Sequence, residues 1–243
     1  MKLLITGGLG FIGSNFIKNI LKKYPNYDIV NLDDERYGSN HLNLDSIKNS
    51  SNYKFVKGNI CNFDLCKKLI KESDTVINFA AESHVDRSIL NAKPFMDSNV
   101  MGVFNILEQI NFYKKRLIQI STDEVFGSLK NESADENFKL NSSSPYASSK
   151  ASAELIVNSY VKTYDCDCII TRCTNNYGPC QFPEKLIPKT LLLAKNNQKI
   201  PIYGTGKNIR DWIHVDDHCN AIIDVLHNGK SGESYNISAN NEI

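Results

Sequence analysis

The sequence predicts an α/β fold in which a doubly wound parallel sheet is followed by a smaller, incomplete C-terminal substrate cap. Two observations lead to this prediction. Short apolar segments alternate with longer amphipathic ones, a pattern typical of strand–helix–strand units with helices on both faces of a parallel sheet. A glycine-rich turn also follows the first apolar segment and opens the first amphipathic one. Together they indicate a sheet of the Rossmann type.

The elements expected in this fold follow in chain order. The apolar segments that we expect to be strands are Leu3–Thr6, Ile29–Leu32, Lys54–Val56, Thr75–Asn78, Leu117–Ser121 and Cys168–Thr171. The amphipathic segments that we expect to be helices are Phe11–Tyr24, Phe63–Lys71, Pro94–Lys114 and Pro145–Tyr164. Right-handed crossovers between parallel strands leave few topologies for these units. The polar stretch 127–144 is expected to be a loop, and its length suits a lid.

The pattern changes after Thr171. Prolines break the following segment into short elements, before one more expected helix at about Val215–Leu226 and a strand-like segment at Ser234–Ile237. We therefore divide the chain into a Rossmann domain that carries the catalytic residues (1–172) and a partial substrate-binding region (173–243) that is interleaved with the Rossmann core.

The bulk composition excludes several classes of protein. The chain has 243 residues, of which 41% are hydrophobic and 23% charged, as is usual for a globular protein. Its net charge of +1 gives no reason to expect nucleic acid or an anionic membrane as a partner. Without a signal peptide or a membrane-spanning apolar run, we expect a cytoplasmic protein. Seven cysteines without a Cys-x-x-Cys pair predict reduced, buried thiols and no metal site.

The glycine-rich turn is typical of a dinucleotide-binding site. Gly7, Gly10 and Gly13 are spaced three residues apart between a predicted strand and a predicted helix. Gly7 permits the tight turn, Gly10 lets a pyrophosphate approach the backbone, and Gly13 lets helix and strand pack closely. The amides of Phe11 and Ile12 then face the phosphates at the positive end of the helix. The alternative is a glycine-rich connection with no ligand.

Asp33 indicates which dinucleotide is bound. It ends the second predicted strand, 20 residues after Gly13, where a carboxylate can accept hydrogen bonds from both ribose hydroxyls. A carboxylate there repels a 2′-phosphate, so we expect NAD and not NADP, although Arg36 nearby weakens that argument. A solvated acidic turn is the alternative. The small residues Ala80 and Ala81 end the fourth strand and leave room for a flat cofactor, or simply for a packed helix.

Tyr146 and Lys150 form a candidate oxidation site with Thr122. They lie one helical turn apart, so the tyrosine and the lysine share a face of the predicted helix. A free tyrosine has a pKa near 10, and a neighbouring ammonium and an oxidised nicotinamide both favour its phenolate. Thr122 then orients a sugar hydroxyl while Tyr146 takes its proton. Without the dinucleotide turn, this spacing would usually mark only a helix surface.

Asp123 and Glu124 are the pair that separates one chemistry from another. They follow Thr122 at the end of a strand, and a solvated turn is the alternative. Once C4 of a hexose is a ketone, its C5 proton becomes acidic. Glu124 can remove that proton while Asp123 protonates the departing C6 hydroxyl. Two carboxyls at one site tend to have different pKa values, which suits a base and an acid.

With these motifs the chain resembles the nucleotide-sugar 4,6-dehydratases of the extended short-chain dehydrogenase/reductase superfamily, from residue 1 to 243. The motifs that carry the resemblance are Ala80–Ser88, Ser121–Val125, Ser144–Lys150, Asn175–Pro179, Phe182–Pro188 and Asn208–Trp212. The resemblance implies a hydro-lyase of deoxysugar synthesis. It would oxidise dTDP-glucose at C4, remove water across C5 and C6, and return hydride to C6, with NAD as cofactor, to give dTDP-4-keto-6-deoxyglucose.

The resemblance also implies residue roles by position. The catalytic residues are then Thr122, Tyr146 and Lys150 for oxidation, Asp123 as the acid and Glu124 as the base. The cofactor-binding residues are Gly7, Gly10, Phe11, Ile12, Gly13, Asp33, Asn59, Ile60, Ala80, Ala81, Ser98, Tyr146, Lys150 and Asn176. The substrate-binding residues are Ser83, Thr122, Asn175, Lys185, Leu186, Pro201, Tyr203 and Arg210. A guanidinium binds phosphate bidentately, so Arg210 is expected to clamp the diphosphate.

Three departures from the family pattern affect these expectations. Asn59 stands where the family has aspartate, so we expect similar but weaker adenine binding. Phe126 stands where the family usually has tyrosine. The family also continues beyond residue 243, so we expect this chain to lack some nucleotide contacts and to be a fragment or a truncated product. The base is therefore open, and the run Gln181–Lys185 is also similar to UDP-sugar relatives, which makes UDP-glucose an alternative substrate.

Other functions on the same fold also stay open. A nucleotide-sugar 4-epimerase or a UDP-glucuronate decarboxylase needs the Thr122, Tyr146 and Lys150 triad but not the acidic pair. An NAD-binding module that is inactive through truncation is a third possibility.

A homodimer is expected from the two longest predicted helices. Both carry apolar residues beyond one stripe, and in this superfamily the corresponding helices form a four-helix bundle between subunits. The residues that suggest it are Phe95, Val103, Leu107, Leu155, Ile156 and Tyr160.

Overall fold

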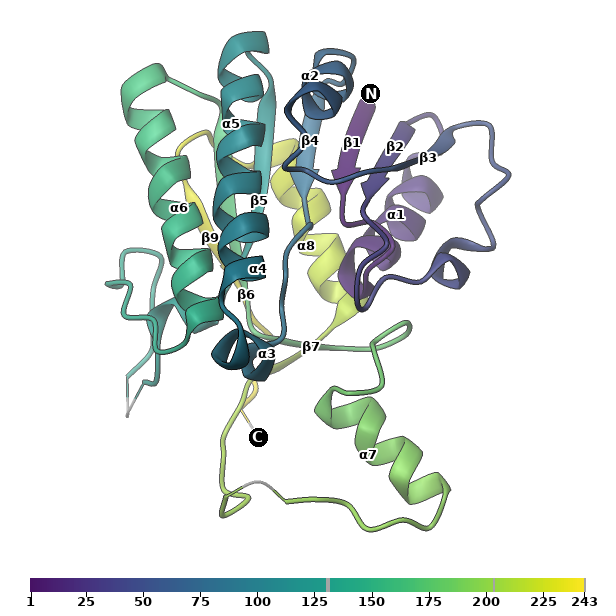
Figure 1. Cartoon of the computed structure of the whole chain (residues 1–243), viewed down its shortest axis with the longest axis vertical. Helices are drawn as coiled ribbons and strands as arrows, with labels where there is room; N and C mark the ends of the chain where they lie inside the picture. The colour runs from purple at the N-terminus through teal and green to yellow at the C-terminus, as the bar shows by residue number, and fades with distance from the viewer. Residues whose placement is uncertain (130–131, 203, 243) are drawn as a thin grey trace.

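The main sheet of the protein has seven parallel strands. The computed structural model describes residues 1–129, 132–202 and 204–242. In them the strands lie in the order β3-β2-β1-β4-β5-β6-β9, as Figure 1 shows. They are β1 (Lys2–Thr6), β2 (Asp28–Asp33), β3 (Tyr53–Lys57), β4 (Thr75–Asn78), β5 (Arg116–Thr122), β6 (Cys168–Cys173) and β9 (Ser234–Ile237). The strand order reverses between β1 and β4, and in such sheets ligands bind outside the carboxyl ends of the strands at this point.

Helices cover both faces of the sheet, so the predicted doubly wound fold is confirmed (Figure 1). One face carries α1 (Phe11–Lys23) and α8 (Val215–Asn228), and the other carries α2 (Phe63–Lys71), α5 (Gly102–Tyr113) and α6 (Pro145–Tyr164). Alternation along the strands explains why both faces are apolar. On β1, Leu3 and Ile5 pack with α1 and α8, whereas Leu4 packs with the helices of the other face.

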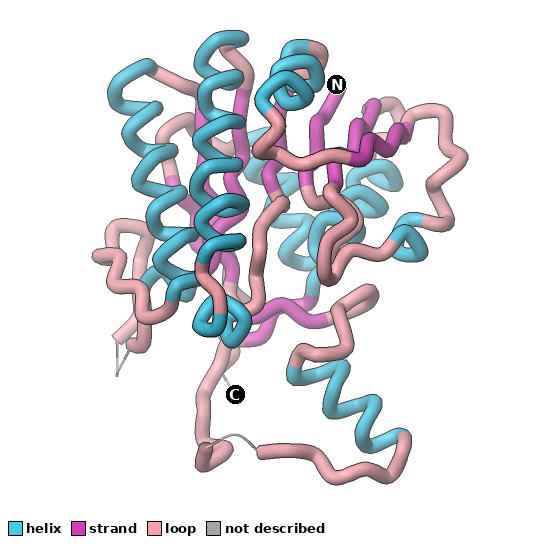
Figure 2. The backbone as a smooth tube through the Cα atoms, viewed as in Figure 1, coloured by secondary structure: helices cyan, strands magenta, loops and turns pink. Residues whose placement is uncertain are grey.

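The region after β6 supplies both the main sheet and a small cap. It contributes α8 and β9 to the Rossmann layers, which agrees with the expected interleaving. Its remaining elements are a parallel pair, β7 (Asn175–Tyr177) and β8 (Trp212–His214), and α7 (Leu186–Lys195). Figure 2 shows α7 between two long loops, beyond the end of the main sheet. No residue of α7 is buried, so the cap covers little apolar surface by itself.

The predicted helix Pro94–Lys114 is wrong as a single element. The structure divides it into α4 (Lys93–Phe95), a π-helical segment η2 (Met96–Met101) and α5. A single wider turn hardly disturbs the apolar periodicity, so the pattern could not reveal it. Lys114 is left-handed, with φ of 51°, and ends α5.

Short helices were also missed. They are α3 (Val85–Leu90), the 3₁₀ turns η1 (His41–Leu44) and η3 (Asp123–Phe126), and α7. The prolines of the cap do not prevent α7, because Pro188 lies in its first turn, where a missing N–H breaks no helical hydrogen bond.

The described part of the 127–144 loop is bound to the edge of the main sheet and does not form the expected lid. None of its described residues lines the pocket discussed below. Instead, Arg172 on β6 donates a hydrogen bond to the Glu136 carbonyl at 3.0 Å, and the Asn236 amide donates to the Glu136 carboxylate at 2.9 Å. Arg172 also forms a buried ion pair with Glu154 on α6, at 2.8 Å. The loop is therefore held against β6 and β9.

No helix within the described ranges is long and apolar enough to cross a membrane.

Candidate active site

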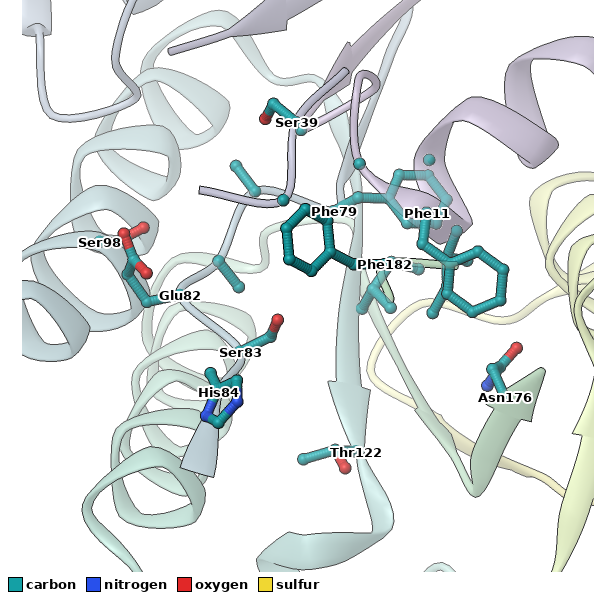
Figure 3. A pocket seen from close by; sticks show the side chains of 18 of the residues that line it. Phe11, Ser39, Phe79, Glu82, Ser83, His84, Ser98, Thr122, Asn176 and Phe182 are labelled. Atoms are coloured by element: carbon teal, nitrogen blue, oxygen red, sulfur yellow. The ribbon is translucent and has the colours of Figure 1, made fainter. Parts of the chain in front are cut away.

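One pocket of about 440 Å³ lies at the carboxyl ends of the central strands. It is lined by every residue that the sequence analysis assigns to the cofactor and by all five assigned to catalysis. Figure 3 shows Phe11, Ser83, Thr122 and Asn176, from four different segments, around this space. The local arrangement explains how each group reaches it.

The turn between β1 and α1 is shaped for a phosphate. Gly7 has φ of +72°, and a Cβ there would lie 2.6 Å from the backbone nitrogen of Ala80. A Cβ on Gly13 would lie 2.5 Å from the Gly7 carbonyl oxygen. Gly10 is the N-cap of α1 and has no side chain to cap it. The first amides of α1 therefore stay available to an anion at the positive helix end.

Asp33 is buried at the end of β2 and already has hydrogen-bond donors. Its carboxylate accepts hydrogen bonds from the Leu9 amide, the Glu35 amide and the Ser39 hydroxyl, each at 2.9 Å. These bonds tie the glycine turn to the loop after β2 and fix the carboxylate at the pocket wall. A carboxylate has about four lone-pair sites, so acceptor capacity remains for a ribose hydroxyl.

Arg36 is not free to hold a 2′-phosphate. Its guanidinium donates a hydrogen bond to Asp34 at 2.5 Å and lies 3.7 Å from a carboxylate oxygen of Glu82. The bond to Asp34 raises the pKa of Arg36. Two carboxylates already surround this cation. Arg36 is therefore a weaker argument for NADP than the sequence indicates.

Asn59 lines the pocket, but its side chain is already engaged. Its carbonyl oxygen accepts from the Cys61 amide at 2.7 Å, and its NH₂ group donates to Asp34 at 2.8 Å. Ile60 beside it is buried. The expected adenine contact through the Asn59 carbonyl must therefore share an acceptor that already has a partner.

Tyr146 and Lys150 are both buried at the start of α6. The helix begins where the Ser144 hydroxyl accepts from the Ala147 amide, with Pro145 in the first turn. Lys150 Nζ donates to the Ile120 carbonyl at 2.6 Å, which points the ammonium at the end of β5. Thr122, the last residue of β5, lies beside them in the pocket.

Burial shifts the pKa values of both Tyr146 and Lys150 toward their neutral forms. Burial lowers the pKa of Lys150 to about 8. Burial, followed by the charges of Glu124, Cys173 and Asp123, raises the pKa of Tyr146, and hydrogen bonding with Thr122 only partly opposes this. Burial thus disfavours the phenolate in the protein alone, and the expected help of the ammonium and an oxidised nicotinamide together stays a prediction.

Asp123 and Glu124 both line the pocket but in different surroundings. Asp123 is half-buried, and the Thr122 hydroxyl donates to its Oδ1 at 3.2 Å. Glu124 lies on the exposed side, and its amide donates to the Thr122 hydroxyl at 3.3 Å. Desolvation raises the pKa of both carboxyls, and the charge of Asp123 raises that of Glu124 further. The charge of Arg210 partly opposes the rise at both acids, and the charge of Lys185 opposes it at Glu124.

The predicted substrate residues are divided by the structure. Those that line the pocket with Thr122 are Ser83, Asn175, Lys185 and Leu186. Pro201 and Arg210 are exposed and do not line it. The Arg210 guanidinium donates to the Ile209 carbonyl at 2.7 Å, although its charge still acts on the two acids. Tyr203 lies outside the described residues.

A latch that sequence reasoning missed closes one side of the pocket. We use this name for Tyr37, His84, Arg87, Phe182 and Glu184. The Tyr37 hydroxyl donates to the Glu184 carboxylate at 2.5 Å, and His84 Nε2 lies 3.2 Å from the same carboxylate. Arg87 stacks 4.0 Å from the Tyr37 ring centre, and the Phe182 ring lies 4.8 Å from it. The latch therefore joins the loop after β2 to the cap.

Comparison with known proteins gives consistent matches over the whole chain. Residues 4–243 match the family model described as GDP-mannose 4,6 dehydratase. A dTDP-glucose 4,6-dehydratase from Streptomyces niveus is 42% identical, and the match covers 100% of this chain and 74% of that protein. A dTDP-glucose 4,6-dehydratase from Bacillus anthracis, solved with NAD, has a TM-score of 0.94 at 48% identity, covering 100% of this chain and 77% of that one. DesIV, a dTDP-glucose 4,6-dehydratase from Streptomyces venezuelae also solved with NAD, has a TM-score of 0.97 at 42% identity and the same coverage.

Proposed function

We propose, from the premise that this chain belongs to the GDP-mannose 4,6-dehydratase family, that it is an NAD-dependent hydro-lyase acting on dTDP-glucose. Its product is dTDP-4-keto-6-deoxyglucose, a precursor of deoxysugars. The observation that carries the proposal is the placement of Asp123 and Glu124 in the same pocket as the dinucleotide turn and Tyr146. An epimerase or a decarboxylase on this fold has no need of that acidic pair.

The residues of the pocket fit NAD. The turn at Gly7 offers unpaired helix amides to the pyrophosphate, Asp33 offers a carboxylate to the adenosine ribose, and Lys150 offers an ammonium to the nicotinamide ribose. A bound NAD would supply the hydride chemistry, as acceptor from C4 and donor to C6.

Oxidation at C4 rests on Tyr146, Thr122 and Lys150. Tyr146 accepts the proton of the C4 hydroxyl, and Thr122 orients that hydroxyl by hydrogen bonding. Because the protein alone raises the pKa of Tyr146, the phenolate needs positive charge brought next to it. The protonated Lys150 ammonium supplies part of that charge from a position fixed by the Ile120 carbonyl.

Elimination rests on Asp123 and Glu124. The raised pKa of Asp123 favours its protonated form, so it can give a proton to the departing C6 hydroxyl as water leaves. Desolvation and the charge of Asp123 raise the pKa of Glu124 as well, and the cations of Lys185 and Arg210 only partly oppose this rise. Glu124 then takes the C5 proton as the base. The assignment of Asp123 as the acid and Glu124 as the base follows the family motif, and the shared pocket supports it.

The substrate is held by groups at the cap side of the pocket. Ser83, Asn175, Lys185 and Leu186 line that side, and the cation of Lys185 suits a diphosphate. Arg210, Pro201 and Tyr203 remain candidate contacts by their resemblance to the family. We keep the proposed boundary between the Rossmann domain (1–172) and the interleaved substrate region (173–243).

A homodimer through α5 and α6 is part of the proposal, but the apolar residues that support it differ from those that suggested it. Among the residues that suggested it, Phe95, Val103, Leu107 and Tyr160 are buried within the chain and form its core. Other apolar side chains on these helices are exposed, namely Phe104 (40%), Phe112 (75%) and Leu155 (61%). Exposed apolar residues of this size favour burial against a partner.

The seven free thiols suit the reducing cytoplasm that we propose as the location of the protein.

The function is tested by incubating the protein with NAD and, separately, dTDP-glucose, UDP-glucose and UDP-glucuronate. We expect a 4-keto-6-deoxy sugar, detected by its absorbance in strong alkali, from dTDP-glucose, and no signal with the Tyr146→Phe variant. Product from UDP-glucose alone would reassign the nucleotide, and carbon dioxide from UDP-glucuronate would make the protein a decarboxylase. Binding of NAD with no conversion of any sugar would favour an inactive binding module.

A further inference from the structure

His218 lies behind the pocket wall and has a polar contact with a residue that lines it. It is fully buried on α8, in the layer where α8 packs against α1. Its neighbour Cys219 belongs to the apolar core between these helices. His218 itself does not line the pocket, but its Nδ1 lies 2.9 Å from Oδ1 of Asn176, which does. A buried imidazole in such apolar surroundings requires a reason.

The hydrogen bonds of Asn176 determine which nitrogen of His218 carries the proton. Asn176 Nδ2 donates to the Thr174 carbonyl at 3.0 Å, so that end of the amide is the NH₂ group. The other end is then the carbonyl oxygen, which can only accept, and His218 Nδ1 must donate to it. Because burial lowers the pKa of His218 to about 4 and keeps the ring neutral, His218 is the Nδ1–H tautomer. Its Nε2 is a bare acceptor that receives no hydrogen bond from any described residue.

This arrangement fixes the amide of Asn176 in one orientation. The oxygen is held on the side of α8, away from the pocket, and the NH₂ group lies on the side of Cys173 and Thr174, which both line it. Figure 3 shows the amide nitrogen of Asn176 turned toward the part of the pocket where Thr122 lies. The Gln181 side chain also donates to the Asn176 backbone carbonyl at 2.8 Å, which holds the residue in place. The end of the Asn176 amide on the pocket side is thus the NH₂ group, which already donates once to the Thr174 carbonyl, and not the oxygen.

We propose that His218 is a positioning residue for the dinucleotide, because it keeps the NH₂ group of Asn176 directed at an acceptor oxygen of the cofactor. The inference rests on the proposed function, in which Asn176 contacts NAD. Without the Nδ1–H donor, the Asn176 amide can turn over and present its oxygen to an oxygen of the cofactor. That orientation loses a hydrogen bond and adds repulsion between two acceptors. Burial lowers the pKa of His218 to about 4, which keeps the ring neutral and the tautomer constant.

The test is a double-mutant cycle on NAD affinity. The chain has a single tryptophan, Trp212, which lines the pocket, so its fluorescence can follow NAD titration. The variants are His218→Leu, which removes the donor, His218→Asn, which keeps an N–H near the position of Nδ1, and Asn176→Ala, alone and combined with His218→Leu. The thermal unfolding midpoint of each variant is measured in parallel.

We expect His218→Leu and Asn176→Ala each to weaken NAD binding by about tenfold, and the double variant to bind no more weakly than Asn176→Ala alone. His218→Asn should restore affinity to within about threefold of the unchanged protein. A purely structural role would instead lower the unfolding midpoint and leave NAD affinity as it was. Losses that multiply to about a hundredfold in the double variant, or unchanged affinity in His218→Leu, would overturn the inference.

Two results separate this inference from the proposed function. An unchanged protein that binds NAD, with a His218→Leu variant that binds it equally well, overturns only the role of His218. An unchanged protein that binds no NAD removes the proposed function and this role together. Nitrogen NMR of the labelled imidazole gives a readout that does not depend on NAD: the Nδ1–H tautomer supports the inference, and the Nε2–H tautomer contradicts it.

Discussion

The hydroxyl of Thr122 donates a hydrogen bond to Oδ1 of Asp123 at 3.2 Å. This bond joins the residue that we propose to orient the sugar hydroxyl during oxidation to the residue that we propose as the acid of elimination. Thr122 ends β5 and Asp123 opens the turn that follows, so in the proposed mechanism both chemical steps take place over one hexose ring.

Replacing the acid should separate the two steps. The Asp123→Asn side chain keeps the shape of the carboxyl but cannot give up a proton, so we expect water loss to slow by about 10²- to 10⁴-fold while oxidation at C4 slows far less. Reduced nicotinamide should then accumulate on the enzyme and be visible by stopped-flow absorbance. The control is Asp135→Asn, an exposed acid on the 127–144 loop. Equal slowing of both steps would count against Asp123 as the acid.

The latch should slow the release of the cofactor. Tyr37→Phe removes the hydroxyl that donates to Glu184 but keeps the ring contacts with Phe182 and Arg87. A hydrogen bond to a charged group contributes on the order of 1.5 kcal/mol or more, so we expect NAD to dissociate about tenfold faster. The release of bound, labelled NAD is followed after mixing with an excess of unlabelled NAD. Tyr24→Phe, at the far end of α1, is the matched control, and equal rates for both variants would contradict this role.

Lys150 should make stability depend on pH in the alkaline range. Its pKa is 10.5 when unfolded and about 8 in the folded protein. Below pH 8 the folded and the unfolded protein both hold the proton on Lys150. The free-energy penalty for burying the charge, which lowers the free energy of unfolding, is then constant. Between pH 8 and 10.5 only the unfolded chain keeps the proton, so the penalty declines as pH rises. Relative to Lys150→Met, the unchanged protein should therefore gain roughly 2 to 3 kcal/mol in free energy of unfolding from pH 7 to 10.

Urea denaturation of both proteins at the two pH values measures this gain. A constant difference between them would mean that Lys150 keeps its ordinary pKa in the folded state.

The proposed dimer depends on the exposed apolar surface of α5 and α6. Leu155 is 61% exposed on α6, and Leu155→Glu would place a charge in the proposed interface. We expect that variant to be a monomer at micromolar concentration by light scattering, whereas the unchanged protein is a dimer. Leu191→Glu, an equally drastic change at a residue that is 65% exposed on α7, should remain dimeric. An unchanged protein that is already monomeric would remove the proposal.

Local features of the chain predicted most of the fold. Strands such as Leu3–Thr6 and helices such as Pro145–Tyr164 have the period of their class, and their structures agree with the prediction within a residue or two. The dinucleotide turn was also predictable, because Gly10 and Gly13 contact residues close in sequence, although Gly7 also meets Ala80 after the neighbouring strand β4. Asp33 could be placed for the same reason, since it follows the turn by one strand.

Long-range contacts limited the rest of the prediction. Tyr37 and Glu184 are 147 residues apart, and neither belongs to a local pattern that could indicate the other. The fall in the pKa of Lys150 depends on how completely the fold buries it, which a Tyr-x-x-x-Lys spacing does not express. We predicted Val103 and Leu107 in a dimer interface, but both lie in the core of the chain. The sequence does not show which apolar side of a helix packs against the rest of its own chain.

In the proposed mechanism, one pocket moves hydrogen from C4 to C6 of the same hexose, while Asp123 and Glu124 remove water between the two transfers. The most direct measurement uses dTDP-glucose carrying deuterium at C4, with NMR and mass analysis of the product. We expect the deuterium in the C6 methyl group of dTDP-4-keto-6-deoxyglucose. Deuterium that stays at C4 of a 4-epimerised sugar, or its complete loss to solvent, would contradict the account.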